Sequence, residues 1–406
     1  MNPRRNFFRR ALGLGVGAAA LQQLAVAQTG APVRVVTPDV TDLPFTVDNG
    51  VKVFRLTAEP VRQAILPGRV LDLWGFNGSA PGPTIQANEG DRIRIIFDNH
   101  LPEPTGIHWH GLELPYEMDG VPGVGQEPVP PGGRFVYEFD LHQNGTFFYH
   151  PHMAMQEMVG MLGGFIIHPR AAWTPQVDRD YLIALQEYAV LPNSTAPNSM
   201  KMEFNWLTFN GKAGPASTPL VVQRGERLRI RIINMGMDHH PIHLHGFTFQ
   251  ETGREGARQP EAIWSRGNTT LVGVAQARDI EFVADRVGEW MLHCHLPHHM
   301  MNQMVSNVGP MTRMGAHMDH GGPGMVMPTV PQGADKVPLF PQDAYMEGPM
   351  MAIDKDVDKP ETFGLPPGWS GYVGGMMTLV RVMQPEQYQK VMSLKAQQRR
   401  GAGGAQ

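Results

Sequence analysis

The sequence predicts an all-β protein in which one structural unit occurs twice. Three observations support this prediction: two segments align without a gap at an offset of 135 residues, charged and apolar residues alternate in both, and glycine and proline are frequent. The 46 glycines and 36 prolines among 406 residues disfavour long helices. Alternation with a period of two is typical of strands that bury one face.

The repeat has two parts. GDRIRIIFDNHLPEPTGIHWHG, residues 90–111, aligns with GERLRIRIINMGMDHHPIHLHG, residues 225–246. Further on, residues 145–161 align with residues 288–304 at an offset of 143. We therefore expect one β unit over residues 45–170, a second over 179–310, and an irregular C-terminal extension over 311–406 that belongs to neither copy. In this extension, residues 371–383 predict a strand and 384–392 a short helix that docks on the body or on a neighbouring chain.

The N-terminus has the pattern of a signal peptide. Arg4 and Arg5 precede an apolar stretch, and Ala25-Val26-Ala27 forms a cleavage pattern. The paired arginines before Phe7-Phe8 resemble a twin-arginine export signal. We therefore expect residues 1–27 to direct export to the periplasm or the extracellular space, with no stable membrane anchor because the apolar stretch is too short to span a bilayer.

Composition limits the class of partner. The formal net charge is -4, and no block of like charges occurs. This distribution gives no basic surface for nucleic acid or for an anionic membrane. It favours a small-molecule substrate.

Ten of the 17 histidines fall in four short motifs. In an H-x-H strand both imidazoles lie on one face, so two such strands can surround a metal cluster. In H-C-H the two histidines lie on one face and the thiolate on the other. The motifs are His108-Trp109-His110, His150-Pro151-His152, His240-Pro241-Ile242-His243-Leu244-His245, and His293-Cys294-His295 with His299.

The ligand types indicate the metal. His240, Cys294 and His299 supply two imidazoles and one thiolate, and Met304 offers a thioether. This set favours copper in an electron-transfer role. Structural zinc is the alternative, but it favours several closely spaced thiolates, and Cys294 is the only cysteine.

Taken in order, these motifs resemble the four copper motifs of the multicopper oxidases. The resemblance implies two cupredoxin-like Greek-key β-barrel or sandwich domains and four coppers. It implies a type 1 site of His240, Cys294, His299 and Met304, and type 2 ligands His108 and His243. It assigns the type 3 copper pair, where dioxygen is reduced, to His110, His150, His152, His245, His293 and His295.

Only 88 positions separate His152 from His240, which leaves no room for a third domain. The chain therefore resembles the two-domain, small-laccase type. That resemblance implies a homotrimeric ring in which each three-copper cluster lies between domain 1 of one chain and domain 2 of the next. In domain 1, Thr105, Pro151 and Gln156 stand where the type 1 ligands stand in domain 2, which predicts a single type 1 site.

Asp119, in Met118-Asp119-Gly120, matches a carboxylate that in this family lies near the type 2 copper and helps protonate oxygen intermediates. Its other interpretation is a turn residue, because Asp-Gly is a strong turn signal. The function expected is laccase-like: one-electron oxidation of phenols, aromatic amines or Cu(I), coupled to four-electron reduction of dioxygen to water.

Two alternatives remain open. Residues 300–351 contain eleven methionines, together with His317 and His320, and soft thioethers suit Cu(I). This pattern allows a cuprous oxidase of copper tolerance or a copper-sequestering protein, or it is only a flexible loop. Copper nitrite reductase is more distant, because that family places its type 1 cysteine in the first domain.

Overall fold

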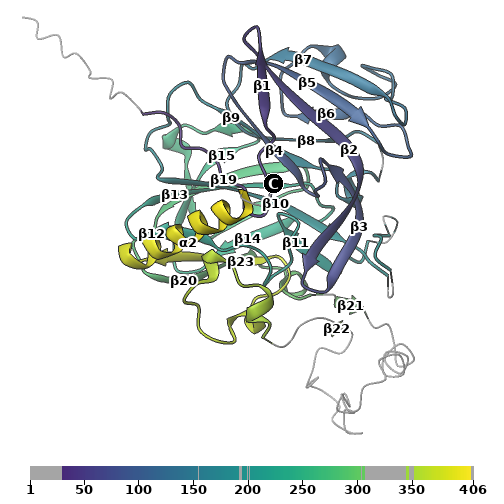
Figure 1. Ribbon diagram of the computed structural model, residues 1–406. Helices are drawn as coiled ribbons and strands as arrows, with labels where there is room; N and C mark the ends of the chain where they lie inside the picture. Colours follow the sequence, from purple (N-terminus) through teal and green to yellow (C-terminus); the bar gives the residue numbers. More distant parts are fainter. Residues whose placement is uncertain are drawn as a thin grey trace, which may run out of the picture.

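The computed structural model describes residues 30–403 except 154, 192–193, 199, 201, 303, 307–343 and 347–351 (Figure 1). For residues 304–306, 344–346 and 402–403 it describes the backbone alone. The predicted signal peptide, residues 1–27, and most of the methionine-rich segment lie outside the described residues.

The first unit is built from two sheets that pack face to face. One has five strands, in the order β1-β2-β5-β7 with β3 paired to β2, and the other has the order β4-β9-β8-β6. Large apolar side chains fill the space between them, with Phe54, Ile95 and Trp109 fully buried. The strands are β1 (Phe45–Asp48), β2 (Val51–Leu66), β3 (Arg69–Phe76), β4 (Gly82–Asn88), β5 (Arg92–Asn99), β6 (Ile107–His110), β7 (Arg134–Asp140), β8 (Gly145–Pro151) and β9 (Gly163–His168). Two 3₁₀ helices accompany them, η1 (Tyr116–Met118) and η2 (Glu157–Val159).

The second unit repeats this plan. Its seven-stranded sheet has the order β11-β10-β13-β19-β15-β16 with β17 paired to β15, and its five-stranded sheet has the order β12-β23-β20-β14-β18. The strands are β10 (Arg179–Tyr188), β11 (Trp206–Phe209), β12 (Leu220–Gln223), β13 (Arg227–Asn234), β14 (His240–Leu244), β15 (Phe249–Arg254), β16 (Ala257–Arg258), β17 (Ser265–Gly267), β18 (Thr269–Val272), β19 (Gln276–Val283), β20 (Gly288–Cys294) and β23 (Met377–Met383). The all-β prediction is confirmed.

The remaining elements are short, apart from one helix. They are η3 (Glu261–Ile263), η4 (Pro297–Met300), β21 (Met304–Ser306), β22 (Ala344–Met346), η5 (Asp354–Asp356), η6 (Pro360–Thr362), η7 (Trp369–Tyr372) and α2 (Pro385–Gly403). Figure 1 shows α2 lying across the outside of the second unit. The described helices include none that is long and apolar enough to cross a membrane.

The C-terminal part is more closely integrated than the sequence predicts. We expect residues 311–406 to belong to neither unit, whereas β23 lies inside the five-stranded sheet, between β12 and β20. It pairs with β20 from Gly288↔Val382 to His293↔Met377. The strand predicted over 371–383 is therefore the structural equivalent of β9, and the helix predicted over 384–392 extends to Gly403.

The two units meet through an apolar patch and a buried ionic network. Phe148 of the first unit packs with Leu182 and Ile233 of the second. Arg231 donates to Thr146 Oγ1 at 2.7 Å, which links the second unit to β8. Because buried charges need partners, such a network favours one relative orientation of the two units.

The network continues on β13 and β19. Asp180 accepts hydrogen bonds from Arg229 and Arg231, and Glu281 pairs with Arg227, Arg229 and Arg258 at 2.9, 2.8 and 2.6 Å. Burial alone would raise the pKa of Glu281, but the guanidinium groups, first that of Arg229, lower it to about 2.

Candidate metal centres

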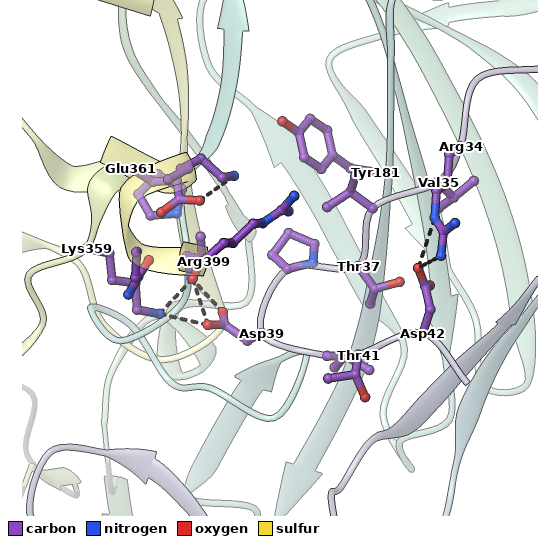
Figure 2. Close-up of a pocket in the computed structure, with 17 residues that line it drawn as sticks. Arg34, Val35, Thr37, Asp39, Thr41, Asp42, Tyr181, Lys359, Glu361 and Arg399 are labelled. Atoms are coloured by element: carbon purple, nitrogen blue, oxygen red, sulfur yellow. Dashed lines mark hydrogen bonds and ion pairs between the residues drawn. The ribbon is translucent and has the colours of Figure 1, made fainter. Parts of the chain in front are cut away.

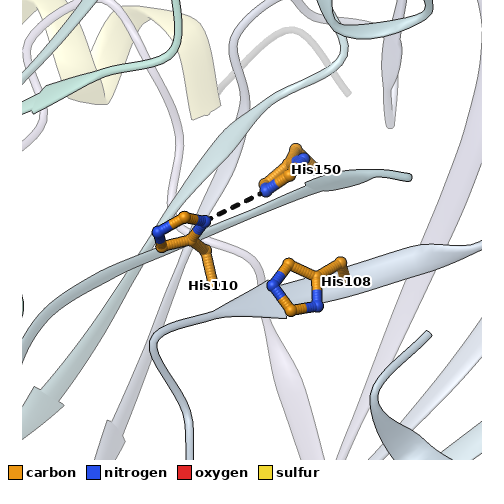
Figure 3. A group of neighbouring side chains, drawn as sticks. All are labelled: His108, His110 and His150. Carbon is orange, nitrogen blue, oxygen red and sulfur yellow. Dashed lines mark hydrogen bonds between the residues drawn. The ribbon is translucent and has the colours of Figure 1, made fainter. Parts of the chain in front are cut away.

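Strands β6 and β8 bring the histidines of the first unit together. The antiparallel register places His108 opposite His150, and His110 opposite Phe148. Because residues two apart share a face, three imidazoles converge at one edge of the sheet (Figure 3).

The donor atoms of this group are spaced as metal ligands would be. Nδ1 of His110 lies 3.3 Å from Nε2 of His150, and one nitrogen from each of His108, His110 and His150 lies within 4.8 Å of the others. Nδ1 of His108 is 2.9 Å from the carbonyl of Asp119, which leaves its Nε2 for a metal. The ring of His152 is 5.6 Å from that of His108, so the fourth predicted ligand stands beside the group.

The second unit repeats this group on β14 and β20. His243 is paired with His293 across the strands, and Nε2 of His245 lies 3.0 Å from Nε2 of His293. Nδ1 of His243 is 2.8 Å from the carbonyl of Asn268, which again leaves Nε2 available. His295 lies with its ring 5.4 Å from that of His243 and is exposed.

Within one chain the two groups remain apart. Among the described residues, no candidate metal group combines histidines of both units. Several of the side chains, including His152, His245 and His295, are exposed. Each group is therefore open to solvent, and each is called a half-site below.

A third group lies inside the second unit and is closed to solvent. Nδ1 of His240 lies 3.2 Å from Nδ1 of His299, and Sγ of Cys294 lies 3.6 and 3.5 Å from these two atoms. All three side chains are fully buried. The centre of such a triangle is about 2 Å from each corner, a distance that suits bonds from a metal to nitrogen or sulfur.

The neighbouring histidines differ from the predicted ligands in their surroundings. His239 is exposed, and its Nδ1 accepts a hydrogen bond from Val274 N–H at 3.0 Å. His298 is exposed as well. His240 and His299 are therefore buried in the group of Cys294, whereas His239 and His298 are exposed.

Glu187 at the end of β10 orients His240. Its Oε2 is 3.1 Å from Nε2 of His240, and its Oε1 accepts hydrogen bonds from the backbone N–H groups of Met237 and Asp238. The Glu187 side chain is fully buried. A carboxylate is the usual outer partner of a histidine that binds a metal. It accepts a hydrogen bond from one ring nitrogen and so turns the other ring nitrogen toward the metal.

Burial favours the neutral forms of several of these side chains. It lowers the pKa of His299 to about 3, with a further contribution from His240, and the pKa of His110 to about 4, with a contribution from His150. Burial also raises the pKa of Cys294 to about 12. Neutral imidazoles are ready to bind a metal, whereas the thiol must lose its proton when the metal enters.

Among its described residues, the first unit has no equivalent of the Cys294 group. Thr105 Oγ1 donates to Gln156 Oε1 at 2.7 Å, and both residues are buried. Gln156 Nε2 donates to the carbonyl of Pro104 at 3.1 Å. A satisfied pair of neutral polar groups thus fills the position that His240 and His299 hold in the second unit.

Asp119 lies next to the first half-site. Its Oδ1 is 3.3 Å from Nδ1 of His108, and its side chain is 38% exposed. This position fits both interpretations from the sequence, because Asp119 also closes η1. The side chain of Met304 lies outside the described residues.

Sequence reasoning missed three carboxylates that lie beside predicted ligand histidines, namely Glu187, Glu157 and Asp238. Oδ2 of Asp238 lies 3.5 Å from Nε2 of His299. Glu187 interrupts the apolar run YLIALQEYAV, and Glu157 Oε1 lies 2.5 Å from Nδ1 of His150. A charged residue inside an apolar strand is a usable signal, because such a group needs a buried partner.

A further cavity lies away from these groups. It has about 850 Å³ and is lined by residues of the segment 34–42, by Tyr181 and by helix α2 (Figure 2). Its charges are largely paired, with Lys359 2.8 Å from Asp39 and Lys395 2.5 Å from Glu361. None of the predicted metal ligands lines it.

Comparison with known proteins identifies a family. A sequence profile described as multicopper oxidase matches residues 60–172, and a second of the same description matches residues 189–310. Together these matches cover more than half of the chain.

Two curated relatives each match about a third of the chain. Copper resistance protein A from Pseudomonas syringae pv. tomato is 34% identical over 145 residues, 36% of this chain and 24% of the relative. Laccase-1 from Cryptococcus neoformans var. grubii is 40% identical over 133 residues, 32% of this chain and 20% of the relative. The matches therefore span about a quarter or less of these relatives' length.

Solved structures match more widely. The blue copper oxidase from Nitrosomonas europaea superposes with a TM-score of 0.58 at 30% identity, covering 62% of this chain and 81% of that one. A second structure, titled multicopper oxidase, gives a TM-score of 0.56 at 27% identity, covering 66% and 93%.

Proposed function

Since the chain belongs to the multicopper oxidase family, we propose that it is a laccase-like oxidase that oxidises small substrates one electron at a time and reduces dioxygen to water. The observation that carries this proposal is the pairing of a closed Cys294 triangle with half-sites on the flanking histidines. Cys294 is covalently joined to His293 and His295, so a continuous covalent path connects the two kinds of site.

The donor set fits copper. We assign His240, Cys294 and His299 to the type 1 site, and His108 and His243 to the type 2 site. The type 3 pair would be held by His110, His150, His152, His245, His293 and His295. Bound at these positions, copper supplies one-electron transfer from the substrate and four-electron reduction of dioxygen.

The chain's own residues prepare these sites. Backbone carbonyls at Asp119 and Asn268 fix the tautomers of His108 and His243. Glu187 does the same for His240. Asp119 is placed to deliver protons at the first half-site, a task that requires an acid near the reacting oxygen.

We propose further that the half-sites complete each other between chains, in a homotrimeric ring with four coppers per chain. Each chain carries one half-site on its first unit and one on its second unit. Head-to-tail contacts between the first unit of one chain and the second unit of the next would therefore close a ring. Charge supports this contact. Residues 111–127 contain four carboxylates and no lysine or arginine. A hollow of about 570 Å³ beside His243 is lined by Arg266, Arg286 and one carboxylate, Asp285, so positive charge is in excess there.

A mixing experiment tests both proposals. His108→Ala/His110→Ala removes the first half-site, and His243→Ala/His245→Ala removes the second, so each variant alone should consume no oxygen. Co-assembled in equal amounts, the two should recover about a quarter of the wild-type rate, because one junction in four joins two intact half-sites. Absence of recovery in confirmed mixed trimers would contradict a cluster shared between chains.

We propose export to the periplasm or the extracellular space on the basis of residues 1–27, with the twin-arginine route as the mechanism. Expression of the full chain with Arg4→Lys/Arg5→Lys should leave the precursor inside the cell. Processing and export at the wild-type level would contradict the route.

Cu(I) is the second candidate substrate. It is favoured by the methionines of residues 300–351 and by the relative named copper resistance protein A. Deleting residues 311–330 should lower Cu(I) oxidation relative to phenol oxidation. An unchanged ratio would contradict a role of this segment in copper delivery.

A further inference from the structure

The strand opposite Cys294 also carries a methionine. Strands β20 and β23 pair in register from Gly288↔Val382 to His293↔Met377. One step further the same ladder sets Cys294 opposite Met376, and Cys294 N–H donates to the carbonyl of Met376 at 3.0 Å. These two residues are therefore direct neighbours across the strands.

Opposite residues of an antiparallel pair have side chains on the same face, with Cβ atoms about 4.5–5.5 Å apart. Met376 is fully buried and belongs to the same apolar cluster as Cys294. Its N–H donates to the carbonyl of His299 at 2.8 Å. The backbone of Met376 is thus tied to two residues of the buried triangle.

The first unit provides an internal comparison. Strands β8 and β9 pair from Gly145↔Ile167 to Tyr149↔Gly163, and this register continued sets Pro151 opposite Met161. Pro151 stands where Cys294 stands in the second unit. The repeat therefore has a buried methionine at the same strand position in both units, Met161 in the first and Met376 in the second.

The gapless sequence alignment pairs Met161 with Met304 instead. In the structure Met304 begins β21, which pairs with β22 in a two-stranded sheet separate from the five-stranded sheet of Cys294. The discrepancy arises because an insertion separates β20 from β23, whereas β8 and β9 follow each other closely.

The two ends of this insertion meet beside the buried triangle. Gly375 N–H donates to Asn302 Oδ1 at 3.1 Å, and Asn302 Nδ2 donates to the carbonyl of Gly214 at 2.8 Å. Gly375 adopts a φ of 57°, and a Cβ there would lie 2.2 Å from the carbonyl oxygen of His299. Only glycine allows the returning chain to pass this close to His299.

We propose that Met376, rather than Met304, supplies the axial thioether of the type 1 site, so that the insertion between Asn302 and Gly375 separates His299 from the fourth ligand. This inference rests on the proposed function. A weak axial thioether tunes the reduction potential of a His₂Cys copper. The substrate-oxidising site then combines residues from both sides of the methionine-rich segment.

Two matched pairs of variants test the assignment: Met376→Leu and Met376→Gln, against Met304→Leu and Met304→Gln. Each is compared in copper-loaded protein by type 1 copper content, visible and electron paramagnetic resonance spectra, and reduction potential. Met376→Leu should raise the potential, because loss of a donor disfavours Cu(II), and Met376→Gln should lower it, because an amide oxygen favours Cu(II). Both Met304 variants should match the wild type.

Opposite shifts at position 376 would not arise from a packing defect alone. Shifts in the Met304 variants with wild-type behaviour of both Met376 variants would overturn the proposal. Equal and same-direction shifts from Leu and Gln at position 376 would overturn it too. A wild-type protein that binds copper without any thiolate-to-copper absorption would instead contradict the proposed function.

Discussion

Replacing Glu187 with glutamine should weaken the type 1 site while the fold is retained. The two side chains have nearly the same shape, and the amide oxygen can still accept from the N–H groups of Met237 and Asp238. The NH₂ group would then face the N–H of His240, a donor opposite a donor at about the present 3.1 Å. The imidazole would lose the partner that turns Nδ1 toward Cys294.

The size of the effect follows from burial. Glu187 and His240 are both fully buried, so water cannot replace the lost acceptor. Loss of a buried hydrogen bond to a charged group costs about 1.5–3 kcal/mol, which corresponds to a loss of copper affinity of about 10- to 100-fold. Copper titration of the apoprotein, followed by the thiolate absorption band, measures this loss.

Glu138→Gln is a matched control. Glu138 forms ion pairs with Arg92 and Arg94 in the first unit, whereas the Cys294 group lies in the second. Replacing Glu138 should therefore leave the copper titration unchanged. Wild-type affinity and an unaltered absorption band in Glu187→Gln would refute the argument that Glu187 positions His240.

Three other substitutions have defined outcomes. Cys294→Ser should abolish the blue absorption and substrate-driven oxygen uptake while the remaining coppers bind, as metal analysis and electron paramagnetic resonance can show; retained oxygen uptake would contradict the assignment. Asp119→Asn should slow oxygen reduction by about 10²- to 10⁴-fold and leave type 1 reduction by substrate unchanged in stopped flow. Glu103→Gln, at an exposed residue outside the segment 111–127, is the control. Glu281→Gln should lower the free energy of unfolding by about 3 kcal/mol at neutral pH, because Glu281 has its pKa lowered from 4.5 to about 2 in the folded protein. That stabilisation is complete above pH 4.5 and is lost as pH falls toward 2, so the gap between variant and wild type in urea titrations should close over this range; a constant gap would contradict the ion-pair explanation.

The sequence predicts what depends on short-range patterns. His108 and His110 share a strand face because they are two residues apart. In the H-C-H motif, the same alternation places the side chain of Cys294 on the face opposite to those of His293 and His295. The residues of these motifs come together in three of the candidate metal groups of the structure.

Long-range pairing could not be predicted in this way. Strand β23 joins β20 across the insertion, and nothing in its local sequence specifies that partner or the register. For the same reason the alignment led to Met304, whereas the ladder points to Met376. Glu187 was missed because its contact with His240 joins β10 to β14, 53 residues apart.

We propose that one chain holds a complete type 1 site and two halves of an oxygen site. Anomalous diffraction at the copper edge from crystals of the copper-loaded protein would locate each copper. We expect one copper between His240, Cys294 and His299, and three more between His108, His110 and His150 of one chain and His243, His245 and His293 of the next. Three coppers enclosed by a single chain, or none at the half-sites of the loaded, active protein, would contradict this proposal.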